Sequence, residues 1–185
     1  MIFFTADTHP GHRNILMLCN RPFATMEEMN ETMISKWNDR VSDTDTVSIV
    51  GDMFFRRSDV ETILKRLIVG NHDSSGINKV DFNRYFVSVD TLLEISDGKH
   101  ALPLCHYPFL TWKHAQKSFM IHGHIYADTT ADFFSLFCQR SSDLKARVDI
   151  NGFVFATFDE LIENNDTFKS KYLQGQRVPM YSRTH

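Results

Sequence analysis

Residues 46–52 read Thr-Val-Ser-Ile-Val-Gly-Asp, an uncharged run of mostly β-branched residues that ends in a glycine and a carboxylate. Apolar runs of this length and composition are typical of buried strands. Similar runs recur along the chain and predict further strands at residues 2–6, 66–69, 85–89, 101–105, 118–121 and 147–155. The last of them is interrupted at Asn151-Gly152. The sequence therefore predicts a protein built around sheets.

Helices are expected between some of these strands. Thr25, with Glu28 three residues later, has the spacing of a helix capping box. Apolar residues then recur at the spacing of a helix face that packs on a core, at Met26, Met29, Met33 and Trp37. Residues 58–65 and 159–164 are shorter helix candidates. Strands alternate with helices in the first part of the chain, and strands predominate after it. This order predicts an α/β protein with one mixed sheet or two packed sheets.

The 185 residues have the size and composition of one folded domain. Hydrophobic residues make up 42% and charged residues 23%, as in ordinary globular proteins. We expect this domain to span residues 1–166, followed by a solvated basic tail at residues 167–185. The tail has four basic residues and no acidic ones: Lys169, Lys171, Arg177 and Arg183. The net charge of −3 argues against a broad basic face for duplex nucleic acid.

The sequence also indicates the compartment. Its apolar runs stay far short of the roughly 18 residues that a membrane span requires, and the N-terminus has no basic start of the kind that signal peptides carry. The three cysteines, Cys19, Cys105 and Cys138, lack metal-finger spacing and are interpreted as reduced thiols. We therefore expect a cytoplasmic protein, either a monomer or a homodimer. The apolar cluster at residues 133–138 is expected to pack in the core or under a cap, with a dimer contact as the alternative.

Polar side chains follow five of the expected strands directly. They are Asp7-Thr8-His9, Gly51-Asp52, Gly70-Asn71-His72-Asp73, His106 and His122-Gly123-His124. Any one of these has an ordinary explanation as a turn former or a surface residue, but their coincidence at strand ends, where α/β sheets bind ligands, indicates one site. Carboxylates, imidazoles and an amide suit divalent ions such as Mn²⁺, Fe²⁺ or Zn²⁺. The set is large enough for two ions that share a carboxylate, the arrangement that serves in-line phosphoryl displacement.

These motifs, in this order and spacing over residues 1–126, resemble the signature of the calcineurin-like metallophosphoesterases. The flanking segments Asn20-Arg21-Pro22-Phe23, Trp37-Asn38 and Cys105-His106-Tyr107-Pro108 resemble the small bacterial and phage phosphoesterases of that superfamily. The resemblance implies a four-layer sandwich of two mixed β-sheets, packed face to face and flanked by helices. It also implies a dinuclear metal site at the strand ends, where the neighbouring glycines permit close backbone approach.

The resemblance implies a role for each matching residue. The implied metal ligands are Asp7 and His9 for the first ion, Asp52 for both ions, and Asn71, His106 and His124 for the second. His72 would be the general acid for the leaving oxygen, oriented by Asp73. A hydroxide that bridges the two ions would attack phosphorus in line, because two ions lower its pKa toward neutrality. Two Mn²⁺ ions are expected, with Fe, Zn, Ni or Mg as alternatives.

One ligand position departs from the family motif Gly-His-x-His. Gly123, His124 and Ile125 are followed by Tyr126, where the family has a histidine that ligates the first metal. A phenol titrates near pH 10 and is a weak ligand for a divalent ion at neutral pH. An alternative register pairs His122 with His124. The sequence therefore predicts weakened binding of the first ion and leaves loss of activity as an open alternative.

Basic and amide side chains near the motifs are candidates for contacting a substrate phosphate. Arg13 and Asn14 follow the first motif, and Arg56 and Arg57 follow the second, with solvated surface as the alternative for each. Arginine suits phosphate through its planar fork. The expected substrate is a small phosphomonoester or phosphodiester, with a nucleotide as one candidate.

The sequence thus predicts a metal-dependent phosphoesterase, a hydrolase with a dinuclear centre. The alternative, which Tyr126 favours, is a catalytically weakened protein that kept the fold as a binding or scaffold module. A third interpretation, a nuclease, is disfavoured because the acidic chain and its small size offer no evident groove for a strand.

Overall fold

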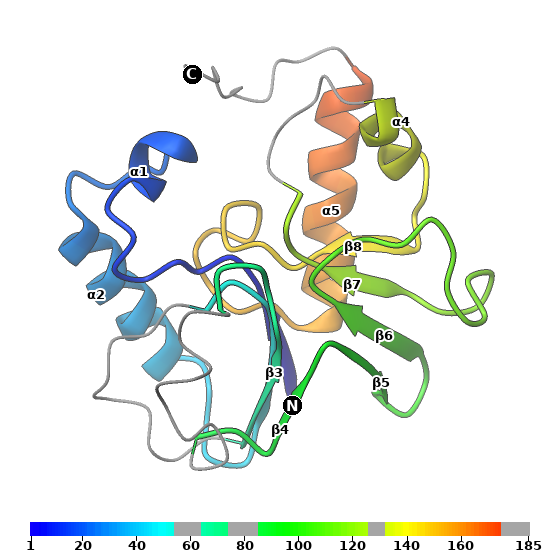
Figure 1. Cartoon of the computed structure of the whole chain (residues 1–185), viewed down its shortest axis with the longest axis horizontal. Helices are drawn as coiled ribbons and strands as arrows, with labels where there is room; N and C mark the ends of the chain where they lie inside the picture. The colour runs from blue at the N-terminus through cyan, green and yellow to red at the C-terminus, as the bar shows by residue number, and fades with distance from the viewer. Residues whose placement is uncertain (54–63, 74–84, 126–131, 175–185) are drawn as a thin grey trace.

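The computed structural model describes residues 1–53, 64–73, 85–125 and 132–174, which form two four-stranded sheets flanked by helices (Figure 1). The first sheet has the order β1-β2-β3-β4. Its strands are all parallel and span Ile2–Thr5 (β1), Thr46–Val50 (β2), Leu64–Ile68 (β3) and Ser88–Asp90 (β4). Their carboxyl ends therefore meet at one edge of the sheet.

The second sheet has the order β5-β6-β7-β8. Its strands span Leu92–Ser96 (β5), Ala101–Cys105 (β6), Met120–His122 (β7) and Asp143–Lys145 (β8). A short turn joins β5 to β6, so this pair is antiparallel, whereas the other two pairs are parallel. Two mixed sheets were expected, but among the described strands only the second is mixed.

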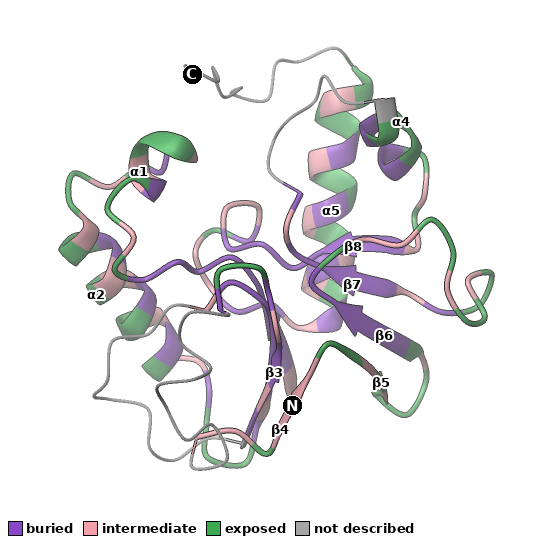
Figure 2. Ribbon diagram, viewed as in Figure 1, coloured by how far each residue is buried: buried purple, intermediate pink, exposed green. Residues whose placement is uncertain are grey.

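One continuous apolar cluster joins the two sheets and forms the main core. It contains Phe4, Val50 and Ile68 from the first sheet or its strand ends, and Leu102, Leu104, Ile121 and Leu144 from the second. Figure 2 shows that β6, β7 and β8 of the second sheet are buried along almost their whole length. Burial on both faces explains why these strands lack a regular alternation of apolar and polar residues.

The helix α2 (Met26–Asn38) covers the outer face of the first sheet, after the short helix α1 (Ile15–Leu18). The Thr25 hydroxyl accepts the backbone N–H of Glu28 at 3.1 Å, and the Glu28 carboxylate accepts the N–H of Ala24 at 2.8 Å. The predicted apolar stripe is buried at Met29, Met33 and Trp37. The Trp37 ring packs in a cluster with Phe3, Val47, Ile49 and Leu67. This helix and its start are confirmed.

On the other side of the molecule, α4 (Asp132–Cys138) and α5 (Phe158–Leu173) lie beside the second sheet (Figure 1). A capping box of Thr157 and Glu160 begins α5. The Asn165 side chain docks the helix on β8, since it bonds both the N–H and the carbonyl of Lys145, at 2.8 and 3.0 Å. None of the described helices is long and apolar enough to cross a membrane.

Several expected boundaries differ from the structure. The helix α5 continues well past residue 164 and crosses the expected domain boundary at residue 166. Lys169, assigned to the solvated tail, is buried and donates to the carbonyls of Arg140 and Asp143, so residues 167–173 belong to the folded unit. Residues 175–185 lie outside the described residues.

Two expected elements are wrong where the structure describes them. Lys65, placed in a helix over residues 58–65, lies in β3, and residues 58–63 are not described. Residues 148–154 form turns, and pairing is limited to isolated bridges at the two ends, Arg147 with Ala6 and Ala156 with Phe4. Between them the Asn151 side chain donates to Arg147 O at 2.7 Å, and the backbone of Asn151 and Phe153 bonds back to Val148 O, so local turns replace a continuous strand.

Candidate metal centre

Five strand ends bring the expected site residues together. Asp7 and His9 follow β1, Asp52 follows β2, and Asn71, His72 and Asp73 follow β3. His106 follows β6 and His124 follows β7, so the second sheet contributes the remaining side chains. The carboxyl ends of parallel strands are where ligands bind in sheets of this kind.

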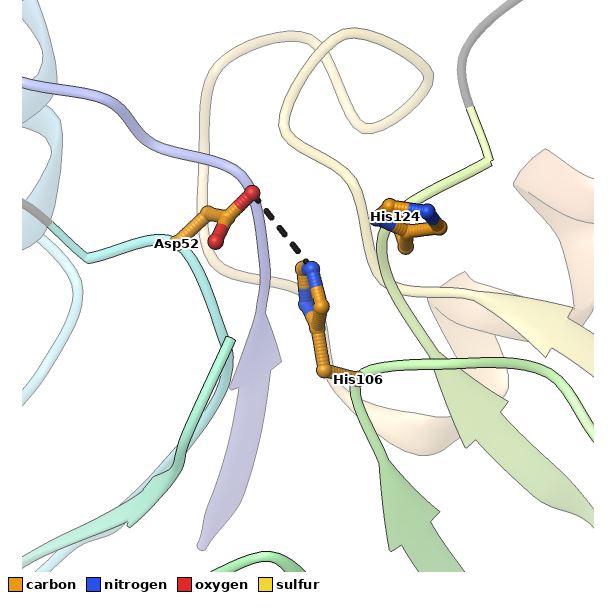
Figure 3. Close-up of side chains that lie close together, drawn as sticks. All are labelled: Asp52, His106 and His124. Atoms are coloured by element: carbon orange, nitrogen blue, oxygen red, sulfur yellow. Dashed lines mark ion pairs between the residues drawn. The ribbon is translucent and has the colours of Figure 1, made fainter. Parts of the chain in front are cut away.

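The structure places these residues in two groups that could each hold a metal ion. One group is Asp7, His9 and Asp52, and the other is Asp52, His106 and His124, with the ligand atoms of each group within 4.8 Å of one another. Figure 3 shows the second group, in which the Asp52 carboxylate faces the His106 ring. The Asn71 Oδ1 atom lies 3.0 Å from His106 Nε2 and 2.9 Å from His124 Nδ1, so Asn71 belongs to this group too.

Asp52 is common to both groups, and its two oxygens have different surroundings. Oδ1 accepts the backbone N–H of His72 at 2.9 Å. Oδ2 is buried without a well-aligned hydrogen bond, 3.4 Å from His106 Nε2 and 3.7 Å from His9 Nε2. A buried carboxylate oxygen without a partner is costly, and a divalent ion on either side of it would satisfy it. The residues present therefore fit a metal centre in which Asp52 is shared.

Burial and neighbouring charges set the protonation of the ligands. Burial lowers the pKa of His9 to about 3 against the opposing effect of Asp52. Burial, helped by the charge of His106, also lowers the pKa of His124. Burial opposes ionisation of Asp52, but contacts with His106 and the His72 N–H outweigh it and hold the pKa of that carboxyl below its usual value. Burial would lower the pKa of His106, but the Asp52 carboxylate outweighs burial and raises that pKa. Burial raises the pKa of Asp7 against the opposing charge of Arg147. Metal binding requires neutral imidazoles and ionised carboxylates, so an ion would displace protons from His106 and Asp7.

The backbone is held in an unusual conformation at the ligands. Asp7, His9, Asp52 and His124 have φ angles of 54°, 48°, 53° and 60°. This left-handed region costs a non-glycine residue on the order of 1–3 kcal/mol. Its concentration at four ligand positions indicates that the surrounding structure is built to hold these side chains toward one another.

Three glycines allow the loops to approach closely, as the sequence predicts. A Cβ atom at Gly51, where φ is 87°, would overlap the His106 ring. One at Gly70 would overlap the Asp52 carboxylate, and one at Gly123 would lie 2.8 Å from Asp7 Oδ2. Each glycine thus stands directly against a ligand of the site.

Asp73 joins two loops of the site. Its Oδ2 atom accepts the backbone N–H groups of Asp52 and Gly70, at 3.0 and 2.8 Å, and its orientation of the His72 ring stays a prediction. Burial raises the pKa of this carboxyl. Asp73 therefore ties the β2 and β3 loops together and positions Asp52.

Sequence reasoning missed His12, which lies beside His72 and His9. The ring centroid of His12 is 6.2 Å from that of His72 and 5.7 Å from that of His9, and the centroids of His72 and His9 are 5.3 Å apart. Nδ1 of His12 is buried and has no hydrogen-bond partner among the described residues. The signal available in the sequence was the turn-forming pair Pro10-Gly11 between His9 and His12. In the structure Gly11 has φ of 81°, and the chain turns back so that the His12 N–H donates to His9 O at 3.2 Å.

Two buried arginines were also missed. Arg21 donates to the carbonyls of Asp7 and Thr8 at 2.7 and 2.9 Å, and so holds the loop that carries the first ligands. Arg147 lies behind Asp7, with Nε 3.7 Å from Asp7 Oδ2. Asp149 pairs with both guanidinium groups. Their separation in sequence left no local pattern to reveal them.

The remaining candidates that the structure describes are not brought into the two groups. His122 lies on the opposite face of β7, where Nε2 is 2.9 Å from Asp143 Oδ1 and the ring packs on Phe137 of α4, which disfavours the register that pairs it with His124. Arg13 and Asn14 are exposed, and their contact with substrate stays a prediction. Arg56, Arg57 and Tyr126 lie outside the described residues.

Comparisons with known proteins add a shared fold and no activity. No protein-family model matches the chain. An uncharacterized protein of Methanocaldococcus jannaschii is 27% identical over 173 residues, which cover 88% of this chain and 89% of the relative. A solved protein of unknown function from Aquifex aeolicus matches with a TM-score of 0.67 and 20% identity, over 88% of this chain and 98% of that one.

A nuclease of Pseudomonas putida matches less well, with a TM-score of 0.42 and 19% identity over 67% of this chain and 60% of that one. A score this low carries no argument about this protein. The chain is therefore an α/β protein that shares its fold with a solved protein of unknown function and has residue groups that could hold a metal ion.

Proposed function

We propose that the protein is a metal-dependent phosphoesterase of the calcineurin-like type, which hydrolyses a phosphomonoester or phosphodiester at a centre of two divalent ions. The observation that carries this proposal is the buried Oδ2 atom of Asp52, which lies between the two ligand groups and lacks a well-aligned hydrogen bond. Dinuclear centres with a shared ligand are characteristic of enzymes that displace groups at phosphorus.

The described residues would hold the two ions as follows. Asp7, His9 and Asp52 would bind the first, and Asp52, Asn71, His106 and His124 the second. When bound, the ions would supply Lewis-acid stabilisation of the charge on the transferring phosphoryl group. The mixed oxygen and nitrogen donors suit Mn²⁺, and Fe, Zn, Ni or Mg are alternatives.

His72 is proposed as the general acid that protonates the leaving oxygen. It is exposed, so a substrate can reach it, and its N–H is anchored by Asp52 Oδ1 at 2.9 Å. The same carboxylate would thus fix both the metals and the acid. Asp73 would act indirectly, by accepting the backbone N–H of Asp52 and so holding that residue in place.

A metal titration tests the proposal. Metal-free protein is supplied with increasing Mn²⁺ and assayed with p-nitrophenyl phosphate and bis-p-nitrophenyl phosphate. Hydrolysis of at least one ester should rise with bound metal and be abolished in Asp52→Asn, because a neutral amide cannot offset two dications. Asp43→Asn, the same change at an exposed site, serves as the control and should retain wild-type activity. Bound metal without turnover of either ester would contradict the proposal and favour the binding or scaffold alternative.

A further inference from the structure

A buried guanidinium lies behind one of the two metal groups. Arg147 Nε is 3.7 Å from Asp7 Oδ2, while Asp7 Oδ1, on the other side of the carboxylate, is 3.9 Å from His9 Nε2. Both side chains are almost completely buried, at 5% and 0% exposure. Asp7 therefore faces a permanent positive charge on one side and a candidate metal position on the other.

Arg147 is fixed in this position. Its guanidinium donates to Asp149 Oδ2 at 2.8 Å and to Ile125 O at 3.2 Å. Asp149 is itself held by Arg21, at 2.9 and 3.1 Å. A guanidinium keeps its proton at all relevant pH values, so the charge can neither move away nor be neutralised when an ion approaches Asp7.

The charge of Arg147 offsets the stronger electrostatic attraction for a cation that the first group would otherwise have. That group contains two carboxylates, Asp7 and Asp52, whereas the second contains only Asp52. Arg147, Arg21 and Asp149 together carry a net charge of +1, and with that charge counted the two groups have equal formal charge. The number of ligands then decides which group binds its ion more tightly. The described residues give three ligands to the first group and four to the second, where Asn71 joins Asp52 and the two histidines.

We infer that the two sites fill in a fixed order: the site at Asn71, His106 and His124 binds its ion tightly, and the site at Asp7 and His9 binds weakly because Arg147 opposes it. The inference rests on the proposed function, since it describes the same dinuclear centre. It makes activity responsive to metal supply, because the protein holds one ion at low metal concentration and completes the pair only at higher concentration.

Calorimetric titration of metal-free full-length protein with Mn²⁺ should show two phases. We expect the two dissociation constants to differ at least about tenfold, because the tight site has one more ligand and the weak site faces a fixed charge 3.7 Å from Asp7. His9→Gln should remove the weak phase and leave the tight one. His124→Gln should weaken the tight phase instead.

A matched pair of variants then tests the role of Arg147. Arg147→Gln, which removes the charge, should tighten the weak phase about tenfold or more and leave the tight phase unchanged. Arg147→Lys, which keeps the charge but loses the planar guanidinium group, should leave the dissociation constant of the weak phase unchanged. Asp149 stays paired with Arg21 in both variants, and Asp7 keeps the backbone N–H of His124 at 3.1 Å. Thermal unfolding monitors the fold of each.

Three results would overturn the inference: phases of equal affinity, loss of the tight phase in His9→Gln, or the same weak-phase affinity in Arg147→Gln as in wild type. Because the titration contains no substrate, its outcome is independent of turnover. Ordered binding without ester hydrolysis would support the inference and contradict the proposed function. Absence of Mn²⁺ binding would contradict both.

Discussion

Gly51 shows how one residue shapes the candidate metal centre. Its backbone has φ of 87°, and a side chain there would overlap the His106 ring. Gly51→Ala should therefore impair metal binding as well as stability. Gly98 is the matched control, since its φ is 93° but no atom lies within 4 Å of the position that a methyl group would take. We expect both alanine variants to lose about 1 kcal/mol or more of unfolding free energy from backbone strain, and only Gly51→Ala to lose Mn²⁺ affinity in calorimetry. Equal Mn²⁺ affinity in the two variants would contradict the conclusion that Gly51 allows the His106 ring to lie against the backbone.

His72 should matter for turnover and not for metal content. General acid catalysis contributes about 10²–10⁴-fold, so His72→Ala should slow hydrolysis by that order while both ions stay bound. The effect should shrink on esters with good leaving groups, which need no proton. Steady-state rates on activated and unactivated esters check this. An equal loss on both would assign His72 another role.

Tyr126 stays a prediction from the sequence, because it lies outside the described residues. Tyr126→His should add an imidazole donor of the kind that these ions prefer and tighten the weak metal phase. The gain in activity should be greatest at limiting metal. Calorimetry would measure it directly. Unchanged binding in this variant would place the weakness at Arg147 and not at the missing ligand.

At the scale of elements, the helices α4 and α5 bury a lysine of β8. Lys145 Nζ lies 4.6, 4.5 and 4.8 Å from the ring centroids of Phe134, Phe137 and Phe168. The attraction of an aromatic ring for a cation is small beside the cost of removing an ammonium group from water. Burial, with the charge of Arg147 adding to it, holds the pKa of this amine well below its usual range. The unfolded chain therefore binds this proton more readily than the folded one.

Lys145→Met should raise the free energy of unfolding by about 1.4 kcal/mol for each unit by which burial lowers the lysine pKa, because methionine has no ammonium group to remove from water. The gain should be full below the folded-state pKa of Lys145 and fade as the pH rises toward the ordinary lysine value, where the wild-type penalty disappears. Urea unfolding at several pH values measures it. Lys99→Met, at an exposed site, is the control. A gain that grows with pH would contradict this account.

Elements with a local signature could be predicted from the sequence, and those that depend on distant contacts could not. The start of α2 was confirmed because Thr25 and Glu28 specify it locally. The length of α5 was underestimated because Asn165, a polar residue of low helix propensity, lies in its middle. Its hydrogen bonds to Lys145 of β8 stabilise the helix there, and these bonds exist only in the folded protein. Short strands such as β8, Asp143–Lys145, carry charged ends and gave no apolar run.

At the scale of the whole molecule, the sheets explain why motifs far apart in sequence form one site. Asp7, Asp52 and Asn71 follow parallel strands of the first sheet, whose ends meet at one edge, so their convergence could be predicted. His106 follows a strand of the second sheet, and its place beside them depends on how the two sheets pack. The supporting residues could not. Arg21 and Asp149 meet across 128 positions, and nothing in the sequence near either indicates the other.

The central claim is that Asp52 joins two ions in one centre. Electron paramagnetic resonance of the protein loaded with Mn²⁺ beyond the second binding phase tests it most directly, because two ions that share a carboxylate are exchange-coupled. The account predicts a coupled signal in the wild type that is lost in Asp52→Asn. The hyperfine pattern of isolated Mn²⁺ alone in the fully loaded wild type would contradict it.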